Sequence, residues 1–557
     1  GWAIDNVSIT GVLAVEVTWA PPTELYFDAA ATTAYISGTP TGTVYTKPTT
    51  TRVYVGSVVG ANGCSASAST TVSIIPTPIL GVLSSSQEVC ATWLASDLTL
   101  TGFSGGNIVR WEYATDAAFT VGLTPIVNVT STLTGSAIGT FTGTRYYRVV
   151  LQSGTCPVVY SNSVYIVFPS TTWDGVTWSN GTPNAGLRAI FNGGATTFSS
   201  VSDIEACSVE VISGIVNINS GHTLIVQNDV KVVGGSLTFE NNASLVQINT
   251  LNNNGVAFAN SGNITYKRVS TPIKKFDYVY WSTPVSPQTL MDFSPATTLF
   301  FSYDPVVSNW AYATSTVPMI LGKGYLIRAP DVAPFNVTTP NNYPGSFIGV
   351  PNTGNITIPI VGGSNQFNLI GNPYPSALGA NAFLSDLANV PVIDATIYLW
   401  THNTPITNNN YNAADYAVYN YSGGVGTGTA ALNPGLNSSV PNGKIASGQG
   451  FFVKGLSSGN IIYKNSMRLV GDNDQFFRMN NFPSNESAEL ERHRFWLDIY
   501  NEEGAYKQML IAYIENATNS GMDRGFDGEM VDVGNPVTLY TPQEDKKLSI
   551  QGRALPF

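Results

Sequence analysis

The residues with the sharpest chemistry in this 557-residue sequence are its four cysteines and three histidines. No two cysteines form a C-x-x-C pair, and three scattered histidines do not supply a zinc cluster. Cys90 and Cys156 stand at the two ends of one β-rich segment, which predicts a disulfide between the first and last strands of a sandwich. Four buried free thiols are the alternative. The seven residues are Cys64, Cys90, Cys156, Cys207, His222, His402 and His493.

Oxygen ligands for a cation gather in one acidic stretch near the C-terminal end. Closely spaced carboxylates of this kind suit Ca²⁺. The order D-x-x-x-D-x-E matches no EF-hand loop, so we interpret the stretch as a solvated turn and predict neither a metal site nor a cofactor. The stretch contains Asp523, Asp527, Glu529 and Asp532.

Motifs for catalysis are not found in the sequence. No G-x-S-x-G motif accompanies the histidines, and His222 follows a Ser-Gly pair that is typical of a surface turn. The run GGVGTG at 423–428 lacks the helix signal that a phosphate-binding loop requires, so we interpret it as a flexible loop. The carboxylate pair of a glycoside hydrolase is not identifiable. We therefore expect a protein that is not an enzyme.

Four aromatic residues in turn-rich segments are candidates for a binding surface. Exposed rings of this type stack on sugar rings, whereas filling a core is their other common role. An extracellular polysaccharide or another surface ligand is the partner that exposed rings would fit. The four residues are Trp173, Trp178, Trp310 and Tyr312.

The composition points to an all-β protein with an uncharged surface. Charged residues make up 11% of the chain, less than half of the ~25% found in a typical soluble domain. The net charge is −11 and no basic cluster exceeds two residues, so a nucleic-acid partner is not expected. No apolar run approaches the ~18 residues that a membrane helix needs. The 53 Gly, 32 Pro, 27 Tyr and 25 Phe favour strands and turns.

Short strands and turns divide the first half of the chain into three segments. Strands separated by turn residues at even spacing predict two tandem Ig-like sandwiches, joined by the stiff Pro-Thr-Pro at 76–78. Strands of about five residues closed by small polar turns then predict a short β-solenoid, with an antiparallel meander as the alternative. We assign 21–78 and 79–169 to Ig-like modules and 170–261 to a β-solenoid-like domain.

A repeated β-unit follows the solenoid-like segment. Matched segments lie 91 to 98 residues apart at the start of the unit and 126 apart at its end, and loop-like insertions absorb the difference. We predict that 262–353 and 354–470 are two copies of one unit. The matches are GNITYKR (262–268) with GNITIPI (354–360), KFDYVYWSTPVSP (275–287) with QFNLIGNPYPS (366–376), TLFFSYD (298–304) with TIYLWTH (396–402), NWAYA (309–313) with DYAVY (415–419), and GKGYLIRAP (322–330) with GQGFFVKGL (448–456).

Both ends of the chain resemble parts of known families. Residues 494–557 contain R-F-W-L-D-I, G-A-Y-K-Q and L-S-I-Q-G-R-A-L-P, and they resemble the start of the type C C-terminal sorting domain of Bacteroidetes proteins exported by the type IX secretion system. The family domain has further strands, so we expect a partial β-sandwich here, preceded by a linker at 471–493. Residues 1–12 resemble the closing strand of MAM and laminin-G jelly rolls, and we assign 1–20 to the end of an upstream domain.

The resemblance implies a secreted protein at the outer cell surface, with the type IX secretion machinery as a partner. Together with the Ig-like spacers and the duplicated scaffold, it predicts a flavobacterial surface adhesin that acts as a stalk or as a self-assembling fibre, with a homo-oligomer or filament as its assembled state. The non-catalytic C-terminal half of a secreted polysaccharide-degrading enzyme is the alternative. Both ends read as strands, so we expect a piece of a longer precursor.

Overall fold

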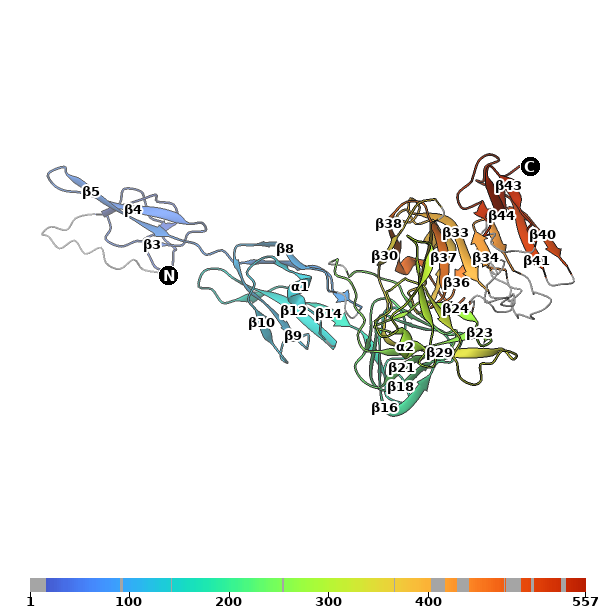
Figure 1. The fold of residues 1–557 in the computed structure, drawn as a ribbon. Coiled ribbons are helices and arrows are strands. Elements are labelled where there is room, and N and C mark those ends of the chain that lie inside the picture. Colours follow the sequence, from blue (N-terminus) through green and yellow to red (C-terminus); the bar gives the residue numbers. More distant parts are fainter. Residues whose placement is uncertain are drawn as a thin grey trace. The chain divides into compact units, whose positions relative to one another are not determined.

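In the structure, a computed structural model, about 49% of the residues lie in strands and 3% in helices, and the helices of the described residues are about one turn long (Figure 1). The predicted all-β fold class is confirmed. The chain divides into two compact units, one formed by 1–87, 96–137 and 144–166 and the other by 88–95, 138–143 and 167–557. No helix in the described residues is long and apolar enough to cross a membrane. The structure describes residues 17–90, 94–141, 143–252, 255–364, 366–401, 416–427, 440–474, 476, 492–501, 505–531 and 537–556.

The N-terminal module is a small β structure around a core that contains five buried residues. Its sheets are β1-β4-β5 and β2-β3. Trp19 of β1 is buried in this core, so 17–20 belong to the module, and their assignment to an upstream domain is wrong. Residues 1–16 lie outside the described residues. The strands are β1 (Val17–Ala20), β2 (Leu25–Tyr26), β3 (Tyr45–Thr46), β4 (Arg52–Val59) and β5 (Ser65–Val72).

The second module has two sheets, in which β10-β9, β9-β12, β12-β13, β11-β8 and β8-β6 are antiparallel pairs. One runs β10-β9-β12-β14-β7, with β13 beside β12, and the other runs β11-β8-β6. Trp111 of β9 and Tyr147 of β12 are fully buried, because alternate residues of each strand face the core. The elements are β6 (Ile79–Leu83), β7 (Gln87–Glu88), β8 (Leu98–Ser104), β9 (Asn107–Ala114), β10 (Thr124–Ile126), β11 (Thr132–Leu133), α1 (Gly135–Ile138), β12 (Gly143–Gln152), β13 (Val159–Tyr160) and β14 (Val164–Phe168).

The second unit begins with a β-solenoid of about four turns. Strands β16, β18 and β21 stack in parallel on one side, and β17, β19 and β22 stack in parallel on another. Parallel neighbours cannot be joined by a hairpin, so the chain must wind around a core, and the alternative of an antiparallel meander is excluded. The strands are β15 (Ser170–Trp173), β16 (Arg188–Ser199), β17 (Ile204–Ala206), β18 (Val209–Ile218), β19 (Thr223–Val226), β20 (Val230–Val232), β21 (Ser236–Phe239) and β22 (Ser244–Gln247).

Two β-units of the same topology follow the solenoid. The sheet of copy 1 runs β24-β28-β26-β27, and that of copy 2 runs β31-β37-β33-β34-β35. Copy 1 contains β23 (Ile264–Ile273), β24 (Tyr278–Trp281), β25 (Val285–Ser286), α2 (Leu290–Phe293), β26 (Phe300–Asp304), β27 (Asn309–Tyr312), β28 (Tyr325–Arg328) and β29 (Asn341–Pro351). Copy 2 contains β30 (Ile356–Ile360), β31 (Phe367–Gly371), β32 (Ala377–Gly379), α3 (Ala380–Leu384), β33 (Ile393–Trp400), β34 (Tyr416–Asn420), β35 (Gly423–Val425), β36 (Lys444–Ile445), β37 (Gly450–Gly455), β38 (Gly459–Tyr463), η2 (Asn465–Met467) and β39 (Arg468–Leu469).

The strand registers of the two copies agree residue by residue. Tyr280 of β24 pairs with Leu326, and Leu369 of β31 pairs with Phe452 in the same way. These pairs set the offset between β24 and β31 at 89 residues, and the pairing of β26 and β33 sets theirs at 97. The sequence offsets of 91 and 98 for these strands were therefore wrong by two residues and one residue, because letters were matched and not the faces of the strands.

The two copies contact each other about a local two-fold relation. Ser282 N–H of copy 1 donates to Gly448 O of copy 2, and Gly371 N–H of copy 2 donates to Gly322 O of copy 1, both at 2.8 Å. Ser282 and Gly371 are equivalent, and so are Gly448 and Gly322, so each hydrogen bond is the counterpart of the other. Such reciprocity is the mark of an isologous contact, here within one chain.

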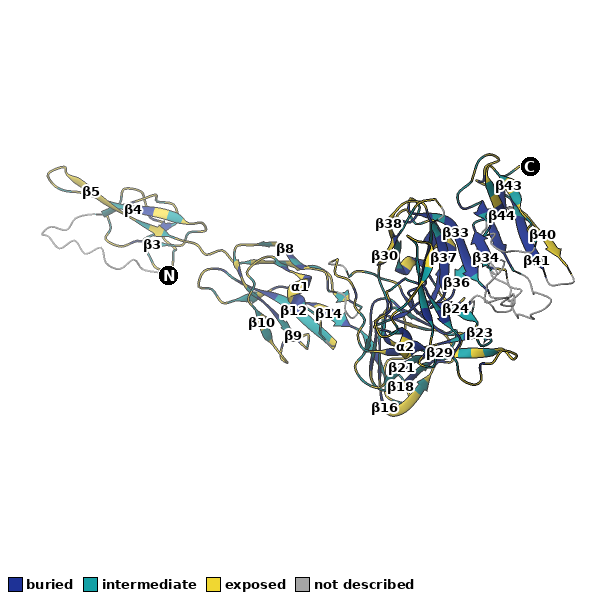
Figure 2. Ribbon diagram, in the orientation of Figure 1, coloured by how far each residue is buried: buried dark blue, intermediate teal, exposed yellow. Residues whose placement is uncertain are grey.

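A C-terminal sheet packs beside copy 2, in the order β40-β41-β44-β42 with β43 beside β44. Residues 493–500 of β40 are all exposed (Figure 2). Phe476 is buried in a core, so the predicted linker at 471–493 is wrong at its start, and most of its remainder lies outside the described residues. Buried β35 also corrects the predicted flexible loop at 423–428. The strands are β40 (Arg492–Tyr500), β41 (Tyr506–Ile514), β42 (Gly528–Glu529), β43 (Thr541–Gln543) and β44 (Lys546–Ala554).

Candidate functional site: an aromatic pocket on the first turn of the solenoid

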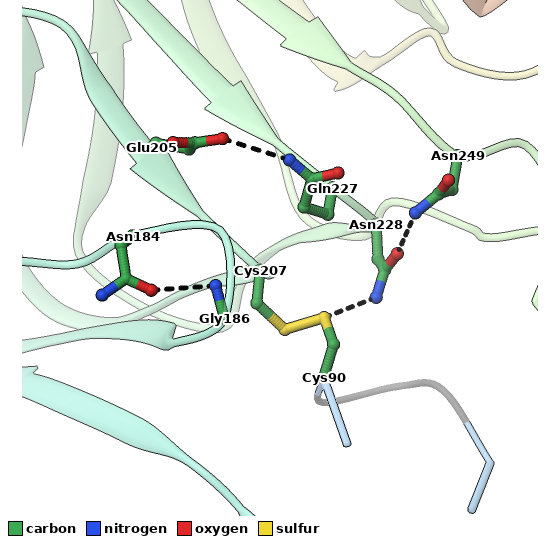
Figure 3. Close-up of a disulfide and its surroundings, with 8 residues drawn as sticks. All are labelled: Cys90, Asn184, Gly186, Glu205, Cys207, Gln227, Asn228 and Asn249. Carbon is green, nitrogen blue, oxygen red and sulfur yellow. Dashed lines mark hydrogen bonds between the residues drawn. A yellow bond between two sulfur atoms is a disulfide. The ribbon is translucent and has the colours of Figure 1, made fainter. Parts of the chain in front are cut away.

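The disulfide joins Cys90 to Cys207 and not to Cys156 (Figure 3). The Cα atoms of Cys90 and Cys207 are 5.6 Å apart, a normal separation for a bridged pair. The predicted bridge is wrong because Cys90 and Cys156 belong to different compact units, although they bracket one β-rich segment in the sequence. Cys156 is a free thiol, as is the exposed Cys64.

The position of Cys207 follows from the repeat of the solenoid. Cys207, Asn228 and Asn249 recur at intervals of 21 residues. Asn249 Nδ2 donates to Asn228 Oδ1 at 3.0 Å, and Asn228 Nδ2 donates to Cys90 Sγ at 2.8 Å (Figure 3). The bridge therefore continues a column of polar side chains on successive turns. A period of 21 residues was the signal in the sequence that could have singled out Cys207.

The acidic stretch is bound internally and is not the solvated turn that we predicted. Asp527 is only 2% exposed, its carboxylate accepts the N–H of Asp523 and of a residue of β44, and burial raises its pKa. Glu529 forms an ion pair with Lys454 at 2.6 Å. Asp532 lies outside the described residues. Within the described ranges, no three potential metal ligands gather in one place.

One serine and one histidine meet in the solenoid, in a structural role. Ser200 Oγ and His222 Nδ1 are 2.8 Å apart. Ser200 is 1% exposed, and its hydroxyl also accepts the N–H of Asn219, so it closes a turn and is out of reach of a substrate. His493 is exposed on β40, and His402 lies outside the described residues.

Two of the predicted aromatic residues are brought together by a tight turn. Trp173 and Trp178 form an antiparallel bridge across the sequence DGVT. The carboxylate of Asp174 accepts the N–H groups of Thr177 and Val176, both at 2.8 Å, and these bonds hold its pKa below the usual value. Gly175 is left-handed there, with φ near +110°, where side chains are rarely tolerated.

The two tryptophans line an open pocket with the next turn of the solenoid. The ring centroids of Trp173 and Trp178 are 5.7 Å apart, and Phe198 of β16 lies 5.3 Å from Trp173. The cavity in front of these rings measures about 530 Å³, within the ~300–1,000 Å³ that ligand sites usually occupy. An apolar wall of flat rings beside an open cavity of this size is suited to a ring-shaped ligand.

Polar side chains also line the pocket. Asp203 Oδ1 accepts the N–H of Thr223 at 2.7 Å, and Glu205 Oε1 accepts Gln227 Nε2 at 3.3 Å. Each carboxylate is exposed and retains a second oxygen for the hydroxyl groups of a ligand. The remaining lining residues that contribute polar atoms come from the same two turns and are Thr182, Thr197, Ser199 and Ser202.

The other two predicted aromatic residues do not join this pocket. Trp310 is half-buried where the two β-units meet, with its ring centroid 5.3 Å from that of Tyr303 and 5.8 Å from that of Tyr280. It fills a core around a small cavity of about 150 Å³. Tyr312 is 77% exposed on β27 and lines neither cavity. The carboxylates Asp203 and Glu205 and the ring of Phe198 were missed, because they reach the site only through stacking of the turns.

Fold and site together define a β-solenoid protein that carries an aromatic pocket and continues into a duplicated β-unit. Residues 169–557 match the model of a family described as a domain of unknown function, DUF8693, and the chain belongs to that family. Residues 79–170 match a second model with the same description, DUF8696. No curated protein matches the chain. The pocket lies wholly within the region matched by the first family.

Proposed function

We propose that this chain is an adhesive and structural protein of the outer cell surface, exported by type IX secretion, and that it binds a saccharide in the pocket of Trp173 and Trp178. The observation that carries the proposal is the pocket itself. Two half-buried indole rings stand beside exposed carboxylates around an open cavity of about 530 Å³. A sugar can stack the flat apolar face of its ring on an indole and donate hydrogen bonds from its hydroxyl groups to carboxylates. The rings and the carboxylates of the pocket would therefore both contact a bound saccharide.

The disulfide supports a location outside the cytoplasm. Bonds of this kind persist in oxidising compartments and are rare where thiols are kept reduced. The Cys90–Cys207 bridge closes a loop of 117 residues, for which chain entropy gives about 5 kcal/mol of stabilisation. The resemblance of 494–557 to a type IX sorting domain supports the same location and names the route of export.

Holding the saccharide, and not cleaving it, is the role that the partners of the carboxylates favour. Asp203 and Glu205 accept hydrogen bonds from Thr223 and Gln227, respectively. Both carboxylates are exposed, so neither is a buried carboxyl group that would stay protonated and act as a proton donor. We therefore expect binding without release of reducing sugar. The alternative, in which the chain is the accessory half of a polysaccharide-degrading enzyme, uses the same pocket to hold polymer near a catalytic domain elsewhere.

Calorimetric titration of the purified chain with soluble polysaccharides of glucose, mannose, galactose and N-acetylglucosamine tests the pocket. We expect one of these to bind, and Trp178→Ala to weaken its affinity about thirtyfold, as loss of ~2 kcal/mol at a central aromatic contact would do. Tyr312→Ala is the matched control, because it removes an exposed ring outside the pocket and leaves the affinity unchanged. Equal losses in both variants, or no binding to any polymer, would contradict the proposal.

The affinity also has an expected dependence on pH. The folded pKa of Asp174 lies below its ordinary value of 3.8, so the ionised carboxylate stabilises the turn fully above pH 3.8. This stabilisation is lost as the pH falls through the lowered pKa. Titration between pH 8 and pH 3 should give a constant affinity that falls only at the acid end, and Asp174→Ala should weaken binding above pH 3.8, where the ionised carboxylate stabilises the turn.

A further inference from the structure

The strand β40 combines an open edge with exposed apolar side chains. Among the described residues it pairs along one edge only, with β41. Phe495, Leu497 and Ile499 on one face are 44%, 45% and 41% exposed, and Trp496 on the other face is 39% exposed. A nine-residue edge of this character is a template for another strand.

The hydrogen bonds between β40 and β41 identify the residues of β40 whose backbone groups point to the open edge. Asn501 N–H donates to Ala505 O at 3.1 Å, and these two residues continue the register of β40 with β41. Hydrogen-bonded pairs alternate along an antiparallel ladder, so every second residue counted from Asn501 directs its backbone toward β41. Arg494, Trp496 and Asp498 lie between those positions and direct their N–H and C=O groups to the open edge.

We propose that β40 pairs with β40 of a second copy of this chain, antiparallel and centred on Trp496. In this register Trp496 lies opposite the partner's Trp496. Arg494 lies opposite the partner's Asp498, and Asp498 lies opposite the partner's Arg494. The backbone N–H and C=O groups of all three residues point to the open edge. These residues therefore form the hydrogen-bonded pairs between the two β40 strands.

Charge complementarity selects both the partner and the register. A centre on Arg494 or on Asp498 places like charges opposite each other, which destabilises a cross-strand pair. A centre on Phe495 or Leu497 places a charged residue opposite Trp496. The centre on Trp496 alone gives two opposite-charge pairs and also sets Phe495 against Leu497 on the second face. The strand is thus complementary to itself, as a two-fold contact requires.

This contact closes after two copies, because the same strand is used on both sides. It therefore joins two chains as a pair and does not propagate a fibre. The inference deepens the proposed surface role, on which its biological use rests, by naming a second copy as a partner. Self-association is measured without saccharide, so its failure would leave binding in the pocket untouched.

Sedimentation velocity on the full chain, over a range of concentrations, tests the register through charge reversal. We expect a dimer, and Asp498→Arg or Arg494→Asp should each raise the dimer Kd roughly a hundredfold by replacing two attractive pairs with two repulsive ones. The double variant Arg494→Asp/Asp498→Arg restores the attraction and should dimerise within about threefold of the original chain. A monomer at the highest soluble concentration, or single variants that dimerise like the original, would overturn the proposal.

Cysteine cross-linking gives an independent readout that does not depend on these charges. The chain carrying Cys64→Ser and Cys156→Ser retains the Cys90–Cys207 bridge and has no other thiol. In that background Trp496→Cys should form a disulfide-linked dimer on mild oxidation, since Cα atoms of directly opposed residues are about 5.5 Å apart. Arg494→Cys and Asp498→Cys are the controls, because each would lie about 13 Å along the strand from its own copy, beyond the reach of a disulfide. Cross-links at either control position, or at none of the three, would contradict the register.

Discussion

The two copies of the β-unit have one pattern of strand pairing and two different surroundings. β24, β28, β26 and β27 of copy 1 correspond to β31, β37, β33 and β34 of copy 2, with the same register in each pair of strands. Copy 1 continues the solenoid, because its β23 stacks in parallel on β21. Copy 2 instead adds β35 to its sheet and packs against the C-terminal sheet.

Equivalent residues differ where the neighbours differ. Tyr266 of β23 corresponds to Ile358 of β30, and both are buried. Tyr266 donates its hydroxyl to Ala243 O on the last turn of the solenoid at 2.8 Å, whereas Ile358 lies in the apolar core of copy 2, next to Gly322 of copy 1. The two copies thus share one strand register because the same positions of each strand face the core. The residue type at such a position differs between the copies because the neighbouring elements differ.

The largest expected effect on the free energy of unfolding comes from core positions that are equivalent in the strand registers of the two copies. Trp281 of copy 1 is 1% exposed against Phe293, Phe347 and Phe476, and its counterpart Ile370 is 2% exposed. We expect Trp281→Ala to lower the free energy of unfolding by about 4 kcal/mol and Ile370→Ala by about 3 kcal/mol. Chemical denaturation measures both, and an unchanged midpoint in either variant would break the equivalence.

The two copies each contain a buried arginine, and the two arginines differ in how many hydrogen bonds they make. Arg468 of copy 2 donates to Ser376, Asn465 and the backbone oxygen of Leu245. Arg268 of copy 1 donates only to Asn242, its Nε and Nη2 make no hydrogen bond within the described residues, and burial lowers its pKa to about 10.

Replacing each arginine by methionine should therefore have opposite outcomes. Arg468→Met removes three hydrogen bonds between Arg468 and its buried partners and should cost about 3 kcal/mol in thermal or chemical unfolding. Arg268→Met removes unsatisfied donors and should leave the free energy of unfolding within about 1 kcal/mol of the original value. A large loss on Arg268→Met would show that this guanidinium has a partner that its present contacts do not include.

The smallest effect is expected at the local two-fold relation between the copies. A Cβ atom on Gly371 would collide with Cβ of its counterpart Ser282, so only one of the two positions has room for a side chain. Gly371→Ser should cost about 2 kcal/mol as overpacking. The exchanged double variant Ser282→Gly/Gly371→Ser should recover most of that loss, and failure to recover would show that the two positions are not interchangeable.

Much of the fold was predictable because side-chain alternation and turn residues are local properties. The same local pattern suits a solenoid and a meander, so parallel stacking could not be inferred before the structure placed Val209 beside Val230. The site was half predictable. Trp173 and Trp178 stand out in a turn, but Phe198 and Asp203 join them only because one turn of the solenoid lies on the next.

The disulfide pairing, like the pocket, depends on how the turns of the solenoid stack. The sequence predicts a Cys90–Cys156 pair because these two residues bracket a β-rich segment, and that argument uses only distance along the sequence. The partner in the structure, Cys207, shares a column with Asn228 and Asn249, and that column is defined by the 21-residue period of the solenoid. The pairing of the cysteines therefore follows the 21-residue repeat of the solenoid and not the boundaries of the modules in the sequence.

Labelling of intact cells tests the central claim of surface location most directly. Antibodies raised against residues 169–557 are applied to cells of the producing organism, with and without a functional type IX translocon, and to the same cells after permeabilisation. The account predicts labelling of intact cells that is lost without the translocon, while signal remains in permeabilised cells. Labelling only after permeabilisation in both strains would contradict a surface adhesin.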